Sequence, residues 1–219
     1  VAELISRVKK QMALFVEKLH QGNYTGFDGQ SSVTDIVVIG IGGSFYGPKM
    51  VVESLAHLES KVSVHFVSNV DEYALHKKLN KLIPSQTLFL IISKTFTTFE
   101  TMLNANAAKQ WLKQSGCSEG KIISCFLAVT ANQENAKAWG VSADNIFPLW
   151  EWVGGRFSVW GAAGLPVAIA YGYTVFDELL DGARSADLHF RHTESRNNIP
   201  VLMALLGVWN SNFLGNDAL

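Results

Sequence analysis

The sequence predicts an α/β fold, a three-layer α/β/α sandwich with a mostly parallel sheet at its centre. Short apolar runs rich in Val, Ile and Phe lack clean alternation, which is typical of strands buried on both faces. Helical patterns separate these runs, so that strand and helix alternate four times. Right-handed crossovers between parallel strands then put helices on both faces of the sheet.

The elements are expected in the following order. Apolar residues recur at helical spacing through the first twenty residues, which predicts an amphipathic helix, and Gly22–Ser32 is expected to be a loop. Strands are expected at Asp35–Gly40, Val62–Val67, Thr87–Ile92 and Ile122–Val129, with a short one near Asn145–Leu149. Helices are expected between them at Pro48–Leu58, Asp71–Leu82, Thr98–Gln114 and Asn132–Trp139.

From residue 147 onward the pattern is mainly helical. Helices are expected at Gly155–Tyr171, Asp177–His192 and Pro200–Leu214. The last of them carries an apolar stripe and is expected to be buried, with Leu202, Leu205, Leu206, Trp209 and Phe213 on one side. Since no long linker divides the chain, residues 1–219 are expected to form one domain, cut before a further one.

Composition excludes several classes of protein. The 48% apolar and 17% charged content favours a well-filled core, and the net charge of −1 offers no basic field for nucleic acid. No apolar run reaches the roughly 18 to 20 residues that span a bilayer, so no membrane partner is expected. The two cysteines, Cys117 and Cys125, do not resemble a secreted disulfide framework, which predicts a cytoplasmic protein.

Two loops rich in glycine and hydroxyl groups predict a phosphate site. Ile39–Ser44 and Ser93–Thr98 each follow an apolar run, where a strand should turn into a helix. If the first strand neighbours the third, as in a flavodoxin-like order, the loops face each other at one sheet edge. Glycine then allows a close approach to an oxyanion, Lys94 supplies charge, and hydroxyls donate from Ser44, Ser93, Thr95, Thr97 and Thr98.

Purely structural roles for these loops stay open. Gly42 and Gly43 can simply form a tight turn, and Thr97 with Glu100 has the spacing of a capping box. Dinucleotide and P-loop fingerprints fit poorly, because Phe45 and the Pro48-Lys49-Met50 sequence occupy their required positions.

A third motif places Arg156 after two glycines at the start of an apolar helix. A cation there opposes the helix dipole, so something negative should compensate it. Glu151 in a structural ion pair is one candidate, and a substrate whose charge develops during reaction is the other. His189 and His192 lie three residues apart without a third ligand, so no metal site is expected.

Three blocks in this order resemble the phosphoglucose isomerase family, whose members contain sugar-isomerase (SIS) domains: Val38–Ser44, Ser93–Thr98 and Trp152–Ser158. The resemblance implies a flavodoxin-like five-stranded sheet, no cofactor, and a hexose 6-phosphate held by Gly43, Ser44, Ser93, Lys94, Thr95, Thr97 and Thr98. It implies that Arg156 stabilises a cis-enediolate as glucose 6-phosphate and fructose 6-phosphate interconvert. It also implies that the full-length protein is a homodimer.

Glu151 and Phe157, where aspartate and tyrosine are common in the family, are mild departures, but one departure is serious. The family's glutamate base, ring-opening histidine and final lysine belong to later blocks that do not occur here. We therefore expect an amino-terminal part of such an enzyme, inactive alone because it lacks the base. The alternatives are a non-catalytic SIS domain that senses sugar phosphates and a generic nucleotide-binding domain, which the poor fit of the fingerprints disfavours.

Overall fold

The computed structural model describes residues 1–216, leaving aside the side chains of residues 72 and 74. It contains two compact units, Val1–Phe176 and Asp177–Leu219, which are described separately. Within the described residues, no helix is both long and apolar enough to cross a membrane.

Unit 1 is built on a five-stranded, all-parallel sheet with the strand order β2-β1-β3-β4-β5. Its strands are β1 (Asp35–Ile39), β2 (Ser63–Val67), β3 (Thr87–Ile92), β4 (Phe126–Thr130) and β5 (Ile146–Pro148). Asp35 of β1 is in register with Ser63 of β2 and with Thr87 of β3. The predicted α/β class and the flavodoxin-like order are confirmed.

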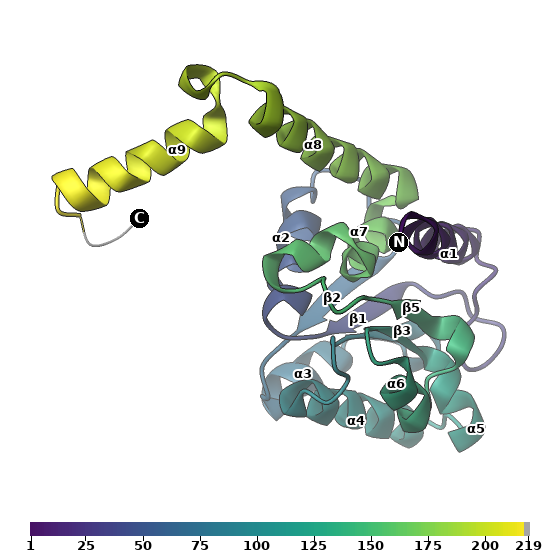
Figure 1. The fold of residues 1–219 in the computed structure, drawn as a ribbon. Helices are drawn as coiled ribbons and strands as arrows, with labels where there is room; N and C mark the ends of the chain where they lie inside the picture. The colour runs from purple at the N-terminus through teal and green to yellow at the C-terminus, as the bar shows by residue number, and fades with distance from the viewer. Residues whose placement is uncertain (217–219) are drawn as a thin grey trace. The chain divides into compact units, whose positions relative to one another are not determined.

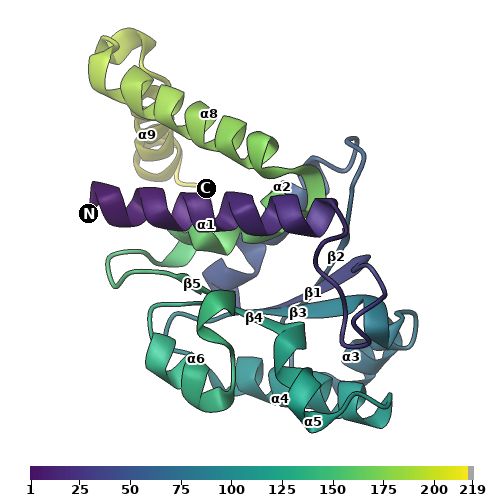
Figure 2. The same cartoon turned by 90° about the vertical axis from the view of Figure 1, so that its right-hand side faces the viewer.

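Helices cover both faces of this sheet (Figure 1, Figure 2). One layer contains α1 (Ala2–His20), α2 (Tyr46–Ser54) and α7 (Leu165–Tyr171). The other contains α3 (Glu72–Leu79), α4 (Phe99–Gln114), α5 (Glu119–Ile122) and α6 (Gln133–Trp139). The predicted three-layer sandwich is therefore correct.

The core lies along the central strands. Every residue of β3 and β4 is buried, as expected for a parallel sheet covered on both faces. Phe89 and Phe126 stack across this strand pair with their ring centroids 5.2 Å apart. The edge strand β2 is only partly buried.

Two predicted elements of unit 1 differ in kind from the structure. The expected strand over Ile122–Val129 begins as helical turns, α5 and Ile123–Cys125, and only then becomes β4. A short apolar run is compatible with a buried helix as well as a strand, so periodicity could not place this boundary. The expected helix over Gly155–Tyr171 consists of 3₁₀ turns at Gly155–Trp160 and Ala162–Gly164 followed by α7, because Gly161 between the turns is extended.

Unit 2 is helical. The helix α8 (Tyr173–His192) begins shortly before this unit, and α9 (Ile199–Val208) continues as a π-turn, Trp209–Phe213. The predicted burial of this last helix is wrong, since none of its residues is buried and Leu206 is 60% exposed. A helix that is apolar on all sides needs cover on all sides, and the described residues of unit 2 supply none.

Candidate functional site

The strand order fixes where a ligand site is expected in unit 1. The order reverses between β1 and β3, which lie side by side in the sheet. In open parallel sheets, ligands bind beyond the carboxyl ends of the strands at such a switch point. The two loops that leave these strands are the predicted phosphate loops, so the fold brings them to the same place.

The loop after β1 is shaped by close backbone contacts. Gly42 has φ +58° and starts a 3₁₀ turn, Gly42–Ser44. A Cβ on Gly43 would lie 2.2 Å from the carbonyl oxygen of Gly155, in the loop that carries Arg156. Only glycine therefore permits the first phosphate loop to approach the arginine loop this closely.

The loop after β3 is held by its own hydroxyl groups. The buried Ser93 Oγ accepts a hydrogen bond from the Phe96 amide at 3.1 Å and lies 3.3 Å from Thr98 Oγ1. Phe96 has a positive φ of 55° while its side chain is buried, a strained conformation of the kind found at functional sites. Thr97 Oγ1 donates to Thr95 Oγ1 at 2.8 Å.

The capping box considered for this loop is not formed. The N-cap of α4 is Thr98, and its side chain makes no capping hydrogen bond. The Thr97 hydroxyl bonds to Thr95 and not to the helix. These hydroxyls therefore serve the loop itself and do not start α4.

Both loops line a cavity of about 250 Å³ together with the loop before Arg156. Its lining includes five predicted residues, Gly43, Ser44, Ser93, Lys94 and Thr98. The lining also contains Ile41, Ile92, Thr101, Leu149, Val153, Gly154, Gly155 and Ser158. Three predicted residues, Thr95, Thr97 and Arg156, are exposed and lie outside this lining.

Arg156 forms no ion pair with any of the described residues. It lies in the 3₁₀ segment Gly155–Trp160, and its guanidinium carbon is 5.1 Å from the centroid of the Phe157 ring. The ion pair with Glu151 that the sequence left open is not found among the described contacts, and Glu151 pairs with Lys94. Lys94 Nζ lies 2.6 Å from the Glu151 carbonyl oxygen and 3.4 Å from its Oε2.

Two polar residues of the cavity were missed in the sequence. Thr101 follows Thr98 by one helical turn in α4, and Ser158 follows Arg156 by two positions. Both are buried. The spacing of Thr98 and Thr101 is a signal that could have found the first, and the position of Ser158 at the end of the block Trp152–Ser158 could have found the second.

Acid–base and metal chemistry have few candidates here. Among the described residues, no carboxylate or imidazole lines the cavity, and no three His, Cys, Asp or Glu side chains form a metal-binding group. The thiols of Cys117 and Cys125 are free and buried, and burial raises the pKa of Cys125 to about 12. A thiol with so high a pKa is a poor nucleophile.

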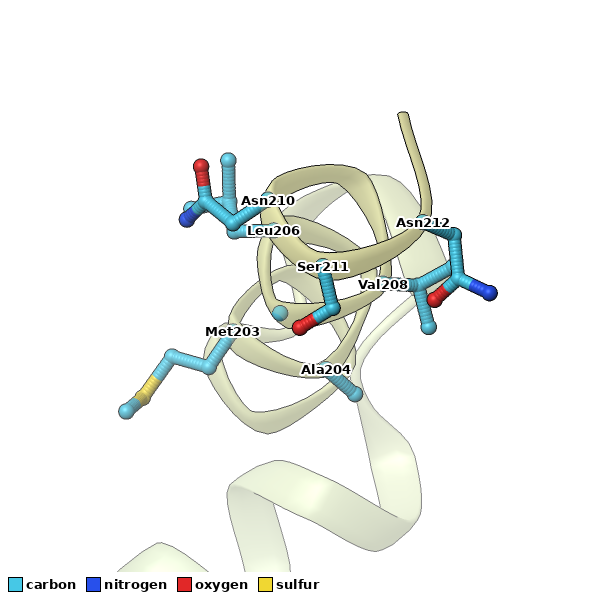
Figure 3. A pocket seen from close by; sticks show the side chains of 8 residues that line it. Met203, Ala204, Leu206, Val208, Asn210, Ser211 and Asn212 are labelled. Atoms are coloured by element: carbon cyan, nitrogen blue, oxygen red, sulfur yellow. The ribbon is translucent and has the colours of Figure 1, made fainter. Parts of the chain in front are cut away.

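A hollow in unit 2 has different chemistry (Figure 3). It measures about 600 Å³, and its described lining comes from α9 and the π-turn, from Met203 to Asn212. The labelled side chains radiate from a single coil instead of converging. Its described lining holds no charged group, so it offers no positive charge to a phosphate.

Comparison with known proteins identifies the family. A family model described as phosphoglucose isomerase matches residues 1–219. The glucose-6-phosphate isomerase of Paraburkholderia phymatum is 46% identical over 211 residues, which are 96% of this chain and 39% of that protein. That of Marinomonas sp. is 49% identical over 93% of this chain and 37% of its own length. The chain thus spans about 40% of the curated relatives it matches.

Solved structures agree with this result. A glucose-6-phosphate isomerase from Chlamydia trachomatis superposes with a TM-score of 0.83 at 32% identity, covering 98% of this chain and 39% of that one. A hypothetical protein from Thermus thermophilus superposes with a TM-score of 0.70 at 26% identity, covering 96% of this chain and 54% of that one. The resemblance found in the sequence is confirmed: the chain belongs to the phosphoglucose isomerase family.

Proposed function

We propose that this chain is the phosphate-binding part of a glucose-6-phosphate isomerase, which interconverts glucose 6-phosphate and fructose 6-phosphate. The observation that carries the proposal is the shared cavity, in which loops from β1, β3 and the Arg156 segment meet at the switch point of the sheet. The relatives' names supply the substrate class.

The phosphate would be held by the two loops. Ser44, Ser93 and Thr98 supply hydroxyl donors to the cavity, and Lys94 supplies positive charge. Gly43 supports the site by allowing the loops to touch. Thr95 and Thr97 belong to the same loop and are proposed as further phosphate ligands at its exposed rim.

Arg156 would act on the sugar and not on the phosphate. A guanidinium keeps its charge at any working pH, so it can stabilise the oxyanion of a cis-enediolate as a proton moves between C2 and C1. Two observations support this role: Arg156 is exposed, and no described residue forms an ion pair with it.

The base that moves this proton would come from outside the chain. The cavity has no carboxylate or imidazole among its described lining residues, and the relatives are more than twice as long as this chain. General acid–base groups commonly contribute about 10²- to 10⁴-fold each to a rate. The chain alone should therefore bind sugar phosphate without turning it over.

Three broader expectations from the sequence remain proposals. We infer a homodimer for the full-length protein and a cytoplasmic location; the family resemblance supports the first and the two free thiols support the second. The treatment of residues 1–219 as a single SIS domain also remains a proposal.

Calorimetric titration tests the proposal directly. The chain should bind glucose 6-phosphate or fructose 6-phosphate, and unphosphorylated glucose much more weakly, because most of the proposed contacts are to phosphate. NAD serves as the competing ligand, and binding of NAD alone would contradict the assignment. A coupled isomerase assay on the same sample should show no turnover, and activity at the level of a complete enzyme would disprove the role assigned to the missing base.

A further inference from the structure

Lys94, the cation of the cavity, already has a partner in the structure. Its ammonium donates a hydrogen bond to the main-chain oxygen of Glu151 at 2.6 Å and lies 3.4 Å from Oε2 of the same residue. The Lys94 side chain is 38% exposed and that of Glu151 is 84% exposed. The positive charge of the site is therefore partly compensated before any anion enters.

We propose that Glu151 tunes the phosphate affinity of the site, because its carboxylate competes with the substrate phosphate for the Lys94 ammonium. This inference rests on the proposed function, because it assumes that phosphate binds beside Lys94. Glu151 would weaken anion binding, and the loss of its contact with Lys94 would accompany phosphate entry.

The geometry favours such an exchange. An ammonium has three N–H donors, so Lys94 can keep its bond to the uncharged carbonyl while it exchanges the carboxylate for a phosphate oxygen. The carboxylate is exposed, and attraction within exposed ion pairs is modest. A phosphate ester carries nearly twice the charge of a carboxylate at neutral pH, so it should win the competition.

The position of Glu151 explains why repulsion also matters. Glu151 lies in the segment that leads from Leu149 to Gly155, and both of these residues line the cavity. A carboxylate 3.4 Å from the ammonium must lie close to any anion that the ammonium holds. Like charges at this separation repel, and the repulsion falls as salt is added.

The test is the isosteric substitution Glu151→Gln, with inorganic phosphate as the probe in calorimetry at low ionic strength. Phosphate should bind about two- to fivefold more tightly, the range expected for removing one exposed charge contact. The gain should shrink at high salt, whereas a purely structural role would give no salt dependence. Glu151→Asp keeps the charge and should bind phosphate nearly as weakly as the original chain.

Glu119→Gln is the matched control. Glu119 forms an exposed pair with Lys113 at 2.6 Å, with side-chain exposures of 79% and 54%, and neither residue lines the cavity. Its loss changes the net charge equally but should leave phosphate affinity unchanged. If the original chain and Glu151→Gln bind phosphate equally well, this inference is wrong while the proposed function stands. The same holds if Glu151→Gln and Glu119→Gln gain equally in phosphate affinity. If no form of the chain binds phosphate or hexose phosphate, the proposed function fails with it.

Discussion

The parallel strands of unit 1 all begin along one side of the sheet, its amino edge, and end along the other, its carboxyl edge. Loops are packed in the same way at these two edges. At the amino edge, a Cβ added to Gly26 would lie 1.6 Å from the carbonyl oxygen of Ser85, in the turn before β3. At the carboxyl edge, a Cβ on Gly43 would lie 2.2 Å from the carbonyl oxygen of Gly155. In both places a glycine lets the backbones of two loops touch.

The edges differ in what their polar groups do. At the amino edge, the Asp28 carboxylate accepts hydrogen bonds from the amides of Gln30 and Ser31 and from the Ser31 hydroxyl. At the carboxyl edge, Arg156 has no ion pair with a described residue and Lys94 holds only an exposed carboxylate and a carbonyl. Close packing is therefore common to both edges. The cations that can still meet an anion lie at the carboxyl edge, which we propose to bind the ligand.

The largest expected effect comes from filling the two glycine contacts. Gly26→Ala and Gly43→Ala each force a methyl group against a neighbouring backbone, and overpacking of this kind commonly costs about 1–3 kcal/mol in the free energy of unfolding. Gly26→Ala should cost more, because its contact is closer. Only Gly43→Ala should also weaken phosphate binding, which calorimetry on the folded variants would measure.

Gly29→Ala is the control for backbone strain without a clash. Gly29 has φ +76°, and a Cβ added there would meet nothing within 4 Å, so alanine should cost only the strain of a left-handed residue, about 1–2 kcal/mol. Urea unfolding would compare the three variants. A Gly26→Ala variant no less stable than Gly29→Ala would show that the backbone contact at the amino edge relaxes freely.

An effect of similar size is expected from Ser93→Ala. The substitution leaves the Phe96 amide without the side-chain acceptor that it has at 3.1 Å, in a buried part of the loop. Loss of such a partner commonly costs about 1–3 kcal/mol in the free energy of unfolding. Phosphate affinity should fall as well, and normal affinity in a destabilised variant would limit Ser93 to a structural role.

Much of the fold could be predicted from sequence because it depends on local patterns. The central strands are continuous apolar runs, and their crossover helices follow with recognisable starts and stops, so the layers and the neighbouring phosphate loops could be inferred. The start of β4 could not be predicted, because the mainly apolar run before Phe126 is compatible with a buried helix as well as with a strand.

The details of the site depended on contacts between distant residues. The touching backbones of Gly43 and Gly155 and the pairing of Lys94 with Glu151 join loops that no local pattern connects. Burial of the last helix was predicted from its apolar stripe, which reports what a helix needs and not what covers it.

A smaller effect on stability is expected from Thr97→Val. The Thr97 hydroxyl is exposed and bonds only to Thr95 Oγ1 among the described partners, so the free energy of unfolding should change by less than about 0.5 kcal/mol. If Thr97 is a phosphate ligand at the rim, phosphate affinity should fall by about two- to fivefold, as for the loss of one modest hydrogen bond. Unchanged affinity would remove Thr97 from the proposed site.

The last effect depends on pH and is expected at the opposite edge, from Asp28→Asn. Hydrogen bonds from Ser31 and Gln30 lower the pKa of Asp28 from 3.8 to about 2 in the folded chain. A lowered folded-state pKa contributes stability that is present above about pH 4 and is lost as the pH falls toward 2. Between pH 7 and pH 2, the melting temperature should therefore fall less steeply for Asp28→Asn than for the original chain. Parallel curves would show that the carboxylate bonds of the amino edge do not stabilise the fold, and the contrast between the two edges would then rest on packing alone.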